Sequence, residues 1–175
     1  MPVVVSTRTT EAVEVPVGPP AIAAPDIRGP MDANASVLHI TDGDTVILQI
    51  GSTKEHVRLI GIDTPESKKP NTPIECFAKQ ASAALESLIP VGTEIRVERD
   101  VEERDRYGRL LGYLFRASDG LFVNYEMART GMAVPLTFPP NVANADRFVE
   151  AGSAAQDNHI GLWSACASGH EPLAG

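Results

Sequence analysis

The stretch at residues 57–66 constrains the fold more than any other part of this sequence. Side chains along its first half alternate between the two faces of an extended chain, which predicts a β-strand. Pro65 has no N–H to donate to a sheet and biases the residue before it towards an extended conformation, so the ladder stops there. The sequence therefore predicts a strand that ends in a sharp bend, where the carboxylates of Asp63 and Glu66 lie beside the guanidinium of Arg58.

Two other charged turns lie next to predicted strands. Residues 42–45, with the sequence DGDT, open the apolar run 46–50, and residues 105–109, with the sequence DRYGR, lead into the strand predicted at 110–115. Charges taken singly are most simply explained as a solvated surface cluster, because most charged side chains are exposed and surface ion pairs stabilise little. Three charged turns at strand ends favour a shared site instead.

The three turns offer ligands for two kinds of ion. Asp44, Asp63 and the carbonyl oxygen of Thr64 are oxygen ligands, which suit Ca²⁺ or Mg²⁺, and no cluster of His and Cys in the sequence suggests zinc. Arg58 and Arg109 can each form forked hydrogen bonds to a phosphate. The sequence thus predicts that a hard cation and a phosphate are bound at one place.

The same residues also have purely structural interpretations. Glu66 has no part in binding either ion, so it is available as a general base. It also suits the start of a short helical turn. The other structural interpretations are that Asp44 caps a turn and that Asp63 forms an Asx-turn. Arg58 would form a partly buried ion pair on its strand, and Arg109 would be an exposed arginine of a hairpin. Each interpretation suffices for one residue, whereas a single site accounts for all of them.

Three motifs, in this order along the chain, resemble those of the thermonuclease family of staphylococcal-nuclease-like enzymes: Asp-Gly-Asp-Thr, Arg-(four residues)-Asp-Thr-Pro-Glu and Asp-(Arg or Lys)-Tyr-Gly-Arg. The likeness covers roughly residues 37–163. The resemblance implies an OB-fold, a five-stranded Greek-key barrel whose strand face commonly binds nucleic acid. The pattern of strands and helices by itself also leaves an α+β sandwich open.

The resemblance also implies an activity. A family member would be a calcium-dependent nuclease of low sequence specificity, which hydrolyses DNA and RNA at the P–O5′ bond and leaves 3′-phosphate ends. The residues carried over motif by motif are Asp44, Asp63 and Thr64 for Ca²⁺, and Arg58, Glu66 and Arg109 for catalysis. All of the matching positions are filled in this sequence.

Two other functions remain open. A catalytically inactive OB-fold module that binds nucleic acid or protein is expected to have lost some of these residues, and none is missing. A Ca²⁺-binding structural domain would not need paired arginines. An EF-hand fits poorly, because a loop counted from Asp42 has Thr53 at its twelfth position, where that site needs Glu.

Charge and aromatic residues depart from the family pattern. The chain has a formal net charge of -8 and a pI of about 4.9, whereas a nuclease usually gains encounter rate from positive potential. Phe138 and Leu136 align with tyrosines that flank the nucleotide in some members, and of the two Phe138 alone keeps a ring for stacking. Tyr107 either stacks on a base or sugar or packs on the barrel. Arg106, Tyr107 and Phe138 are the predicted substrate-binding residues.

The pattern predicts an α+β, mainly β domain with about three α-helices. Strands are expected at residues 37–40, 45–50, 56–62, 93–99 and 109–116, and helices at residues 75–89, 123–130 and 144–158. A disordered, proline-rich arm is expected at residues 1–35, the nuclease domain at residues 36–165 and a tail at residues 166–175.

The cysteines and the chain start bear on location. Cys76 and Cys166 either form a disulfide or remain free thiols, and a disulfide favours an extracytoplasmic setting. The first residues lack the basic and apolar segments of a secretory signal, so the protein is either cytoplasmic or begins after a removed signal. Many members of the family that it resembles are secreted, and we expect a secreted or cell-envelope protein. We also expect a monomer without membrane insertion, because no apolar run reaches the length of a membrane span.

Overall fold

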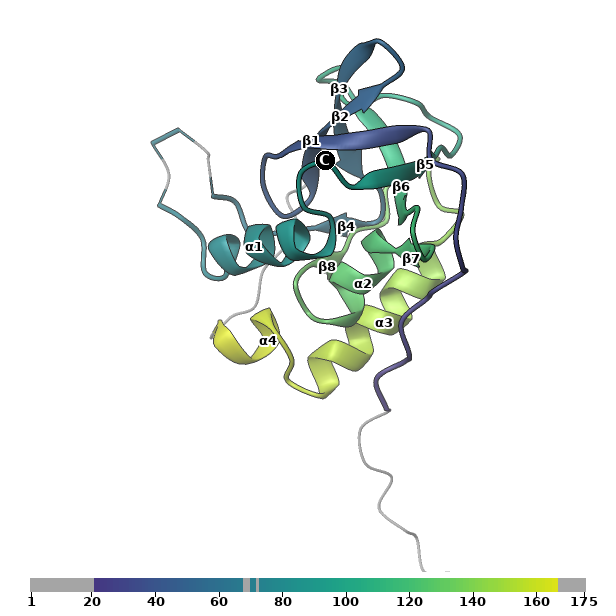
Figure 1. Cartoon of the computed structure of the whole chain (residues 1–175). Helices are drawn as coiled ribbons and strands as arrows, with labels where there is room; N and C mark the ends of the chain where they lie inside the picture. Colours follow the sequence, from purple (N-terminus) through teal and green to yellow (C-terminus); the bar gives the residue numbers. More distant parts are fainter. Residues whose placement is uncertain (1–20, 68–69, 72, 167–175) are drawn as a thin grey trace, which may run out of the picture.

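The computed structural model describes residues 21–67, 70–71 and 73–166 of the chain (Figure 1). Its barrel consists of strands β1 (Ala35–Ile40), β2 (Thr45–Ile50), β3 (Thr53–Leu59), β5 (Glu94–Glu98) and β6 (Leu110–Arg116). These strands follow the order β3-β2-β1-β5-β6, and a parallel pairing of β3 with β6 closes the sheet on itself. The short β7 (Leu121–Phe122) extends the sheet beyond β6. The predicted α+β fold with a five-stranded barrel of the OB type is confirmed.

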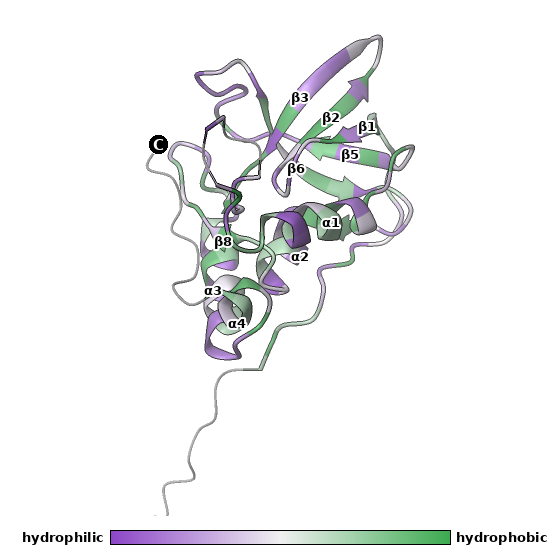
Figure 2. Ribbon diagram, turned by 90° about the vertical axis from the view of Figure 1, so that its left-hand side faces the viewer, coloured by the Kyte–Doolittle hydropathy of each residue, from purple (hydrophilic) through white to green (hydrophobic). Residues whose placement is uncertain are grey.

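The hairpin of β2 and β3 extends beyond the barrel before it enters the core. β3 is coloured as largely hydrophilic in Figure 2, and its first residues are mostly exposed. Val57 and Leu59, further along the strand, are buried. The polar half of β3 therefore projects into solvent, and its apolar end leads the chain into the interior just before the bend with the carboxylates.

The prediction of a strand over residues 56–62 is wrong at the C-terminal end of that strand. β3 stops at Leu59, and β4 (Ile62–Asp63) pairs with β8 (Val134–Pro135) in a separate small sheet. The break lies at Gly61, whose φ of 85° is a conformation that side chains disfavour. A Cβ at this position would also overlap the ring of Phe148. Glycine therefore allows the chain to turn there, and the turn redirects the following residues towards the site.

The described residues form three longer helices and one short helix: α1 (Ala78–Leu88), α2 (Val123–Arg129), α3 (Ala145–Asp157) and α4 (Leu162–Ala165). α1 and α2 pack against barrel strands, and α3 packs against α2 and β8. The helix predicted from residue 75 begins later, at Ala78, because residues 75–77 form a turn in which Phe77 has a φ of 72°. Ala81 and Leu85 face the core from α1. The first predicted helical turn is therefore a connector to the loop that carries Glu66.

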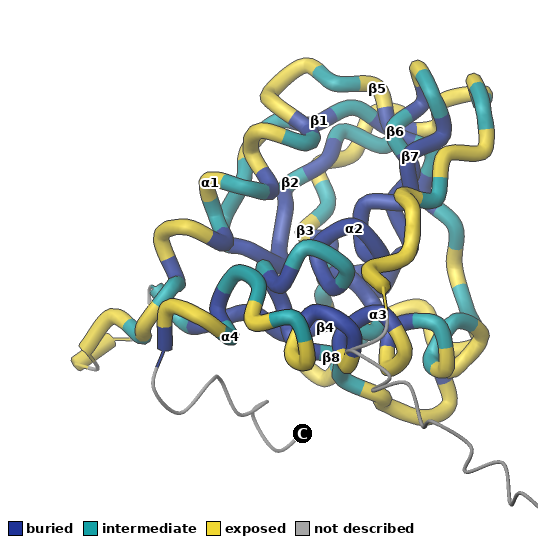
Figure 3. The backbone as a smooth tube through the Cα atoms, turned by 90° about the horizontal axis from the view of Figure 1, so that it is seen from below, coloured by how far each residue is buried: buried dark blue, intermediate teal, exposed yellow. Residues whose placement is uncertain are grey.

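Helix α2 is buried along most of its length, as Figure 3 shows from below. Its Asn124 is fully buried and donates hydrogen bonds to the carbonyl oxygens of Ile60 and Gly112, at 2.9 and 3.1 Å. The Asn124 side-chain oxygen accepts the N–H of Leu114 at 2.9 Å. This side chain satisfies buried backbone groups of the turn after β3 and of β6, and it ties that turn to the centre of the fold.

Part of the arm predicted at residues 1–35 contacts the barrel. Residues 26–31 run along the β6–β7 turn, where the N–H groups of Gly29 and Met31 donate to the carbonyl oxygens of Asp119 and Ala117, each at 2.8 Å. The guanidinium of Arg28 lies 4.5 Å from the ring centre of Phe115. This part of the predicted arm is held by the sheet edge, because its backbone groups find partners there.

Two predicted segments lie partly outside the residues that the structure describes: residues 1–20 of the arm predicted at 1–35 and residues 167–175 of the tail predicted at 166–175. Among the described helices, none combines the length and the apolar character needed to cross a bilayer.

Candidate active site

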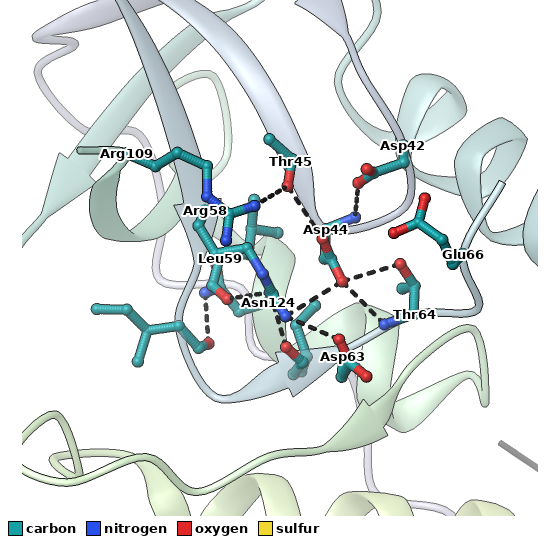
Figure 4. A network of polar contacts seen from close by, with 12 residues as sticks. Asp42, Asp44, Thr45, Arg58, Leu59, Asp63, Thr64, Glu66, Arg109 and Asn124 are labelled. Atoms are coloured by element: carbon teal, nitrogen blue, oxygen red, sulfur yellow. Dashed lines mark hydrogen bonds and ion pairs between the residues drawn. The ribbon is translucent and has the colours of Figure 1, made fainter. Parts of the chain in front are cut away.

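A cleft of about 590 Å³ lies where the three charged turns meet at one end of the barrel. Every residue predicted to bind metal, phosphate or substrate lines it: Asp44, Arg58, Asp63, Thr64, Glu66, Arg106, Tyr107, Arg109 and Phe138. Figure 4 shows the polar contacts of the inner wall, where segments from β2, β3 and β4 converge. Turns far apart in sequence are adjacent here because β3 pairs with both β2 and β6.

Asp44 enters β2 at the bottom of the cleft, with an exposed fraction of 6%. Its Oδ2 accepts hydrogen bonds from the N–H and the hydroxyl of Thr64, at 2.9 and 3.0 Å, and its Oδ1 accepts one from the hydroxyl of Thr45 at 3.0 Å. Gly43 permits this approach, since a Cβ there would lie 2.8 Å from the methyl group of Thr64. Burial alone raises the pKa of Asp44, but the charge of Arg58 and the Thr64 hydrogen bonds lower it below its ordinary value.

Arg58 lies between the two predicted metal ligands. Its Nη2 is 2.9 Å from Oδ1 of Asp63 and 3.3 Å from Oδ2 of Asp44, and the side chain is only 13% exposed. Its Nη1 donates to the carbonyl oxygens of Leu59 and Ile62, each at 2.8 Å. Arg58 thus forms the structural ion pair that the sequence left open as an alternative, and it also holds the turn around Gly61 closed.

Asp42 lies in the negative field of Asp44 and Glu66. Burial, together with the charges of Asp44 and Glu66, raises the pKa of Asp42 to about 7. The carboxylate of Glu66 faces the region of Asp42 and Thr64 in Figure 4. Arg58 therefore leaves part of the local negative charge without compensation, which is a field that attracts a cation.

Arg109 lies just before β6, in the turn that also carries Arg106 and Tyr107; we call this side of the cleft the outer wall. The Nε of Arg109 donates to Oδ2 of Asp105 at 2.7 Å, and its N–H donates to Oδ1 of the same carboxylate at 3.0 Å. A long contact of 3.5 Å joins its Nη1 to the hydroxyl of Thr45. Asp105 holds the inner part of the guanidinium, so that the Nη end is presented to the cleft, and the side chain is 32% exposed.

The predicted substrate-binding residues lie at the exposed rim of the cleft. The guanidinium of Arg106 lies 4.8 Å from the ring centre of Tyr107, and its Nη2 donates to the Tyr107 hydroxyl at 2.7 Å. The exposed fraction is 69% for Tyr107 and 54% for Phe138. Neither ring packs in the core, and both are exposed to solvent. The alternative of Tyr107 packing on the barrel is not what the structure shows.

The donor set fits a hard cation in part. Asp44, Asp63 and Thr64 supply oxygen atoms, and Ca²⁺ completes its six to eight ligands with backbone carbonyl oxygens and water. Within residues 21–67, 70–71 and 73–166, no three His, Cys, Asp and Glu side chains form a cluster that could hold a metal by themselves. The carboxylates would therefore provide some of the ligands, and the backbone and solvent the rest.

Cys76 and Cys166 form a disulfide, with a Cα–Cα separation of 5.9 Å. The bond joins the turn before α1 to the end of α4. Neither cysteine lines the cleft. The free-thiol alternative is thus not the state of this structure.

Sequence reasoning missed three residues that shape the cleft. Asp42 and Asp105 lie inside the motifs that were recognised, yet their roles as a neighbouring charge and as the holder of Arg109 depend on side-chain direction. Asn141 had no sequence signal at all. Its side-chain oxygen accepts a hydrogen bond from the N–H of Glu102 at 2.7 Å, and its side-chain nitrogen donates to the carbonyl oxygen of Glu102 at 3.0 Å. These bonds join two segments that line the cleft.

Comparison with known proteins agrees with this geometry. The family model described as "Staphylococcal nuclease homologue" matches residues 56–165. The chain is 36% identical to the thermonuclease of Staphylococcus intermedius over 146 residues, which cover 83% of each chain. It is 34% identical to the thermonuclease of Staphylococcus hyicus over 128 residues, 73% of this chain and 74% of that one.

A further relative is Endonuclease YncB of Bacillus subtilis (strain 168), with 32% identity over 133 residues, 75% of this chain and 62% of that protein. These relatives bear the names of nucleases, which supports a nuclease function here. The barrel, the converging motifs and the extent of the match lead to one assignment: the chain belongs to the staphylococcal nuclease family.

Proposed function

We propose that this protein is a calcium-dependent nuclease that cleaves DNA and RNA with low sequence specificity, at the P–O5′ bond, leaving 3′-phosphate ends. The observation that carries the proposal is the convergence of Asp44, Asp63, Glu66 and Arg109 on one open cleft. Nucleic acid is the substrate class expected from the family. A phosphodiester needs charge neutralisation and a correctly placed water, and this set of side chains can supply both.

The inner wall would hold the cation. The side-chain oxygens of Asp44 and Asp63 are acceptors in residues at most 6% exposed, and Thr64 follows Asp63 on the bend. When bound, Ca²⁺ neutralises phosphate charge and orients the scissile group. The negative charge around Asp42 favours a cation at this wall, and the oxygen-only donors favour Ca²⁺ over zinc.

The outer wall, which contains Arg109, would bind the phosphate. Arg109 presents its Nη end to the cleft, while Asp105 occupies its Nε. Two Nη groups in one plane match two phosphate oxygens, a geometry that lysine lacks. Arg58 supplies a second positive charge close by, and its contacts to Leu59 and Ile62 keep that charge in a fixed place. Positive charge fixed before the reaction stabilises the developing charge of the transition state without reorganisation.

Glu66 would act on the attacking water. It lies next to Thr64 and Pro65 on the bend, it lines the cleft, and its side chain is partly exposed, so water can reach it. A carboxylate in this position accepts a proton from water or holds the water in line with the leaving oxygen. Proton acceptance by Glu66 and charge stabilisation by Arg109 would thus come from opposite sides of the same phosphate.

The rim would contact the rest of the nucleic acid. Phe138 and Tyr107 offer exposed rings on which bases can stack without sequence preference. Arg106 adds a positive charge at the same place, which matters more in a chain of net charge -8 than in a basic protein. Low sequence specificity follows, because stacking and phosphate contacts do not read base edges.

We extend the proposal to the setting. A disulfide between Cys76 and Cys166 persists in oxidising compartments, which supports a secreted or cell-envelope location. We propose that the protein acts there as a monomer. Fractionation of the native host and light scattering of the purified protein test these two points.

The decisive experiment is digestion of a labelled single-stranded oligonucleotide by the purified protein with Ca²⁺, with Mg²⁺ or with EGTA. The proposal expects cleavage with Ca²⁺, loss of cleavage with EGTA, and products whose mobility shifts after phosphatase treatment because they carry 3′-phosphates. A parallel reaction with Glu66→Gln separates the protein from a contaminating nuclease. Equal cleavage in EGTA, or 3′-hydroxyl ends, would contradict the proposal.

A further inference from the structure

Glu66 and Glu75 are joined by two hydrogen bonds across the base of a loop. The N–H of Glu66 donates to Oε2 of Glu75 at 2.8 Å, and the N–H of Glu75 donates to the carbonyl oxygen of Glu66 at 3.1 Å. The two residues are nine positions apart. Both the N–H and the C=O of Glu66 are therefore held by the same partner, which fixes the backbone from which the Glu66 side chain projects into the cleft.

The bend that carries Glu66 lies outside the strands of the sheet. The residue before Glu66, Pro65, has no N–H, so it cannot donate a hydrogen bond to a neighbouring strand. β4 has already ended at Asp63. A network of hydrogen bonds and ion pairs holds the inner wall around Asp44, and the two hydrogen bonds with Glu75 hold the backbone of the bend that carries Glu66.

A disulfide bond at the next residue restrains the position of Glu75. Glu75 precedes Cys76, whose disulfide with Cys166 bridges a sequence separation of 90. The next residue, Phe77, has a left-handed backbone, and the start of α1 there has no side-chain capping hydrogen bond. Cys166 follows α4, where Leu162 is fully buried and its N–H donates to the carbonyl oxygen of Gly131 at 2.8 Å. The disulfide thus connects the Glu75 turn to a small buried cluster that contains Val134, Leu162 and Cys166.

We propose that Glu75 is a positioning residue for Glu66, and that the Cys76–Cys166 disulfide holds Glu75 in place, so that turnover depends on the oxidation state of this pair. The inference rests on the proposed role of Glu66 in the reaction. Reduction by a dithiol transfers two electrons and two protons to the disulfide, giving two thiols and the oxidised dithiol. Cys76 is exposed, so a reductant can reach its sulfur.

If Glu75 no longer holds the Glu66 backbone, the rate of the chemical step should fall, and substrate binding should stay nearly unchanged. A base displaced by about 1 Å can lower the rate by as much as about 10²-fold, because proton transfer needs a near-attack geometry. Arg109 and Phe138 lie on other segments of the cleft wall and keep their positions. We therefore expect a fall in kcat with little change in KM.

Variants of Glu75 test the hydrogen bond separately from its charge. We expect Glu75→Ala to lower kcat about 10- to 100-fold. Glu75→Gln keeps a side-chain oxygen that can accept the Glu66 N–H, so it is expected to stay within about threefold of the wild type, since a neutral acceptor still forms the bond. Glu86→Ala on α1 is the matched control, because it removes an exposed glutamate from the adjoining helix.

The disulfide is tested by a double-mutant cycle at a temperature where all variants are folded by near-ultraviolet circular dichroism. Cys76→Ser/Cys166→Ala, or reduction followed by alkylation, is expected to lower kcat several-fold in the wild type. In the Glu75→Ala background the same change should have little further effect, because the disulfide acts through Glu75. Amide hydrogen exchange of Glu66 provides a readout independent of activity, with protection expected to fall in both variants.

The outcomes separate the two levels of the argument. Wild-type kcat in Glu75→Ala, independent effects of the two changes in the cycle, or unchanged exchange of the Glu66 amide would overturn the inference alone. Equal damage by Glu75→Gln and Glu75→Ala would overturn the hydrogen-bond role. Absence of any calcium-dependent cleavage by the untreated wild type would instead overturn the proposed function, and the inference with it.

Discussion

The two walls of the cleft are built in opposite ways. On the inner wall, Asp44, Asp63 and Thr64 are each at most 6% exposed and are joined to one another or to Arg58 by hydrogen bonds and ion pairs. On the outer wall, Tyr107 is 69% exposed, and the main contacts of the Arg109 side chain come from its own turn.

This difference separates two kinds of functional residue. Charges on the inner wall are part of the core, so their removal is expected to damage fold and function together. Charges on the outer wall are placed by a local turn, so their removal should affect the reaction while the barrel stays intact. Four substitutions test the comparison, in order of decreasing expected effect.

Arg58→Ala should have the largest effect, because it leaves the buried carboxylates of Asp44 and Asp63 without their counterion and frees two backbone carbonyl groups. Breaking such a buried pair costs about 3–5 kcal/mol. Urea denaturation measures this loss of unfolding free energy, and activity should be lost as well. A stability within about 0.5 kcal/mol of the wild type would show that the inner wall is not part of the core.

Arg109→Lys should lower kcat/KM by about 10²–10³-fold, because lysine cannot form a forked contact with phosphate. The free energy of unfolding should change by no more than about 0.5 kcal/mol, since the side chain lies on a local turn. Arg106→Lys, on the same turn, is the matched control and should keep most of the activity. If Arg109→Lys turns over at nearly the wild-type rate, Arg109 has no catalytic role.

Gly61→Ala tests the turn that supports the inner wall. A methyl group there would overlap the Phe148 ring, and the positive φ of 85° is strained for alanine. Backbone strain and overpacking each cost about 1–3 kcal/mol, so we expect a loss of about 3 kcal/mol in urea denaturation. Gly51→Ala is a control with positive φ but open space around the Cβ. Equal losses in the two variants would mean that the contact with Phe148 does not matter.

Phe138→Ala should have the smallest effect of the four. Loss of one stacking platform weakens nucleic-acid binding by about 1–3 kcal/mol, which raises KM about 5- to 100-fold and leaves kcat nearly unchanged. Phe138→Tyr keeps the ring and should bind as the wild type does. Fluorescence anisotropy with a labelled oligonucleotide in EGTA measures the affinity without cleavage, and equal affinity of the alanine variant would remove Phe138 from the substrate site.

Much of the fold was predictable because it follows from local patterns. The strand β2 and the helices α2 and α3 lie within one residue of the predicted bounds, since alternation and helical periodicity are written in adjacent residues. Predictions were less accurate where a distant contact decides the conformation. The strand through residue 62 ended early because Gly61 meets Phe148, and the helix from residue 75 began late because the turn at Phe77 precedes it.

The candidate site shows the same division. Motif spacing was enough to bring every predicted ligand to the cleft, because the motifs end strands that close one barrel. It was not enough to give their contacts. The position of Arg58 between two carboxylates, the support of Arg109 by Asp105 and the pairing of Glu66 with Glu75 depend on side-chain directions that adjacent residues do not determine.

The sequence by itself determined the order of the elements, the types of ligand available and the family, because these depend on residue identity and spacing along the chain. The tertiary structure decided which charges compensate each other, which are buried and which face solvent. The physical reason is that electrostatic free energy depends on the distance between charges and on their exclusion from water, and both arise only when β3 pairs with β2 and β6 to close the barrel.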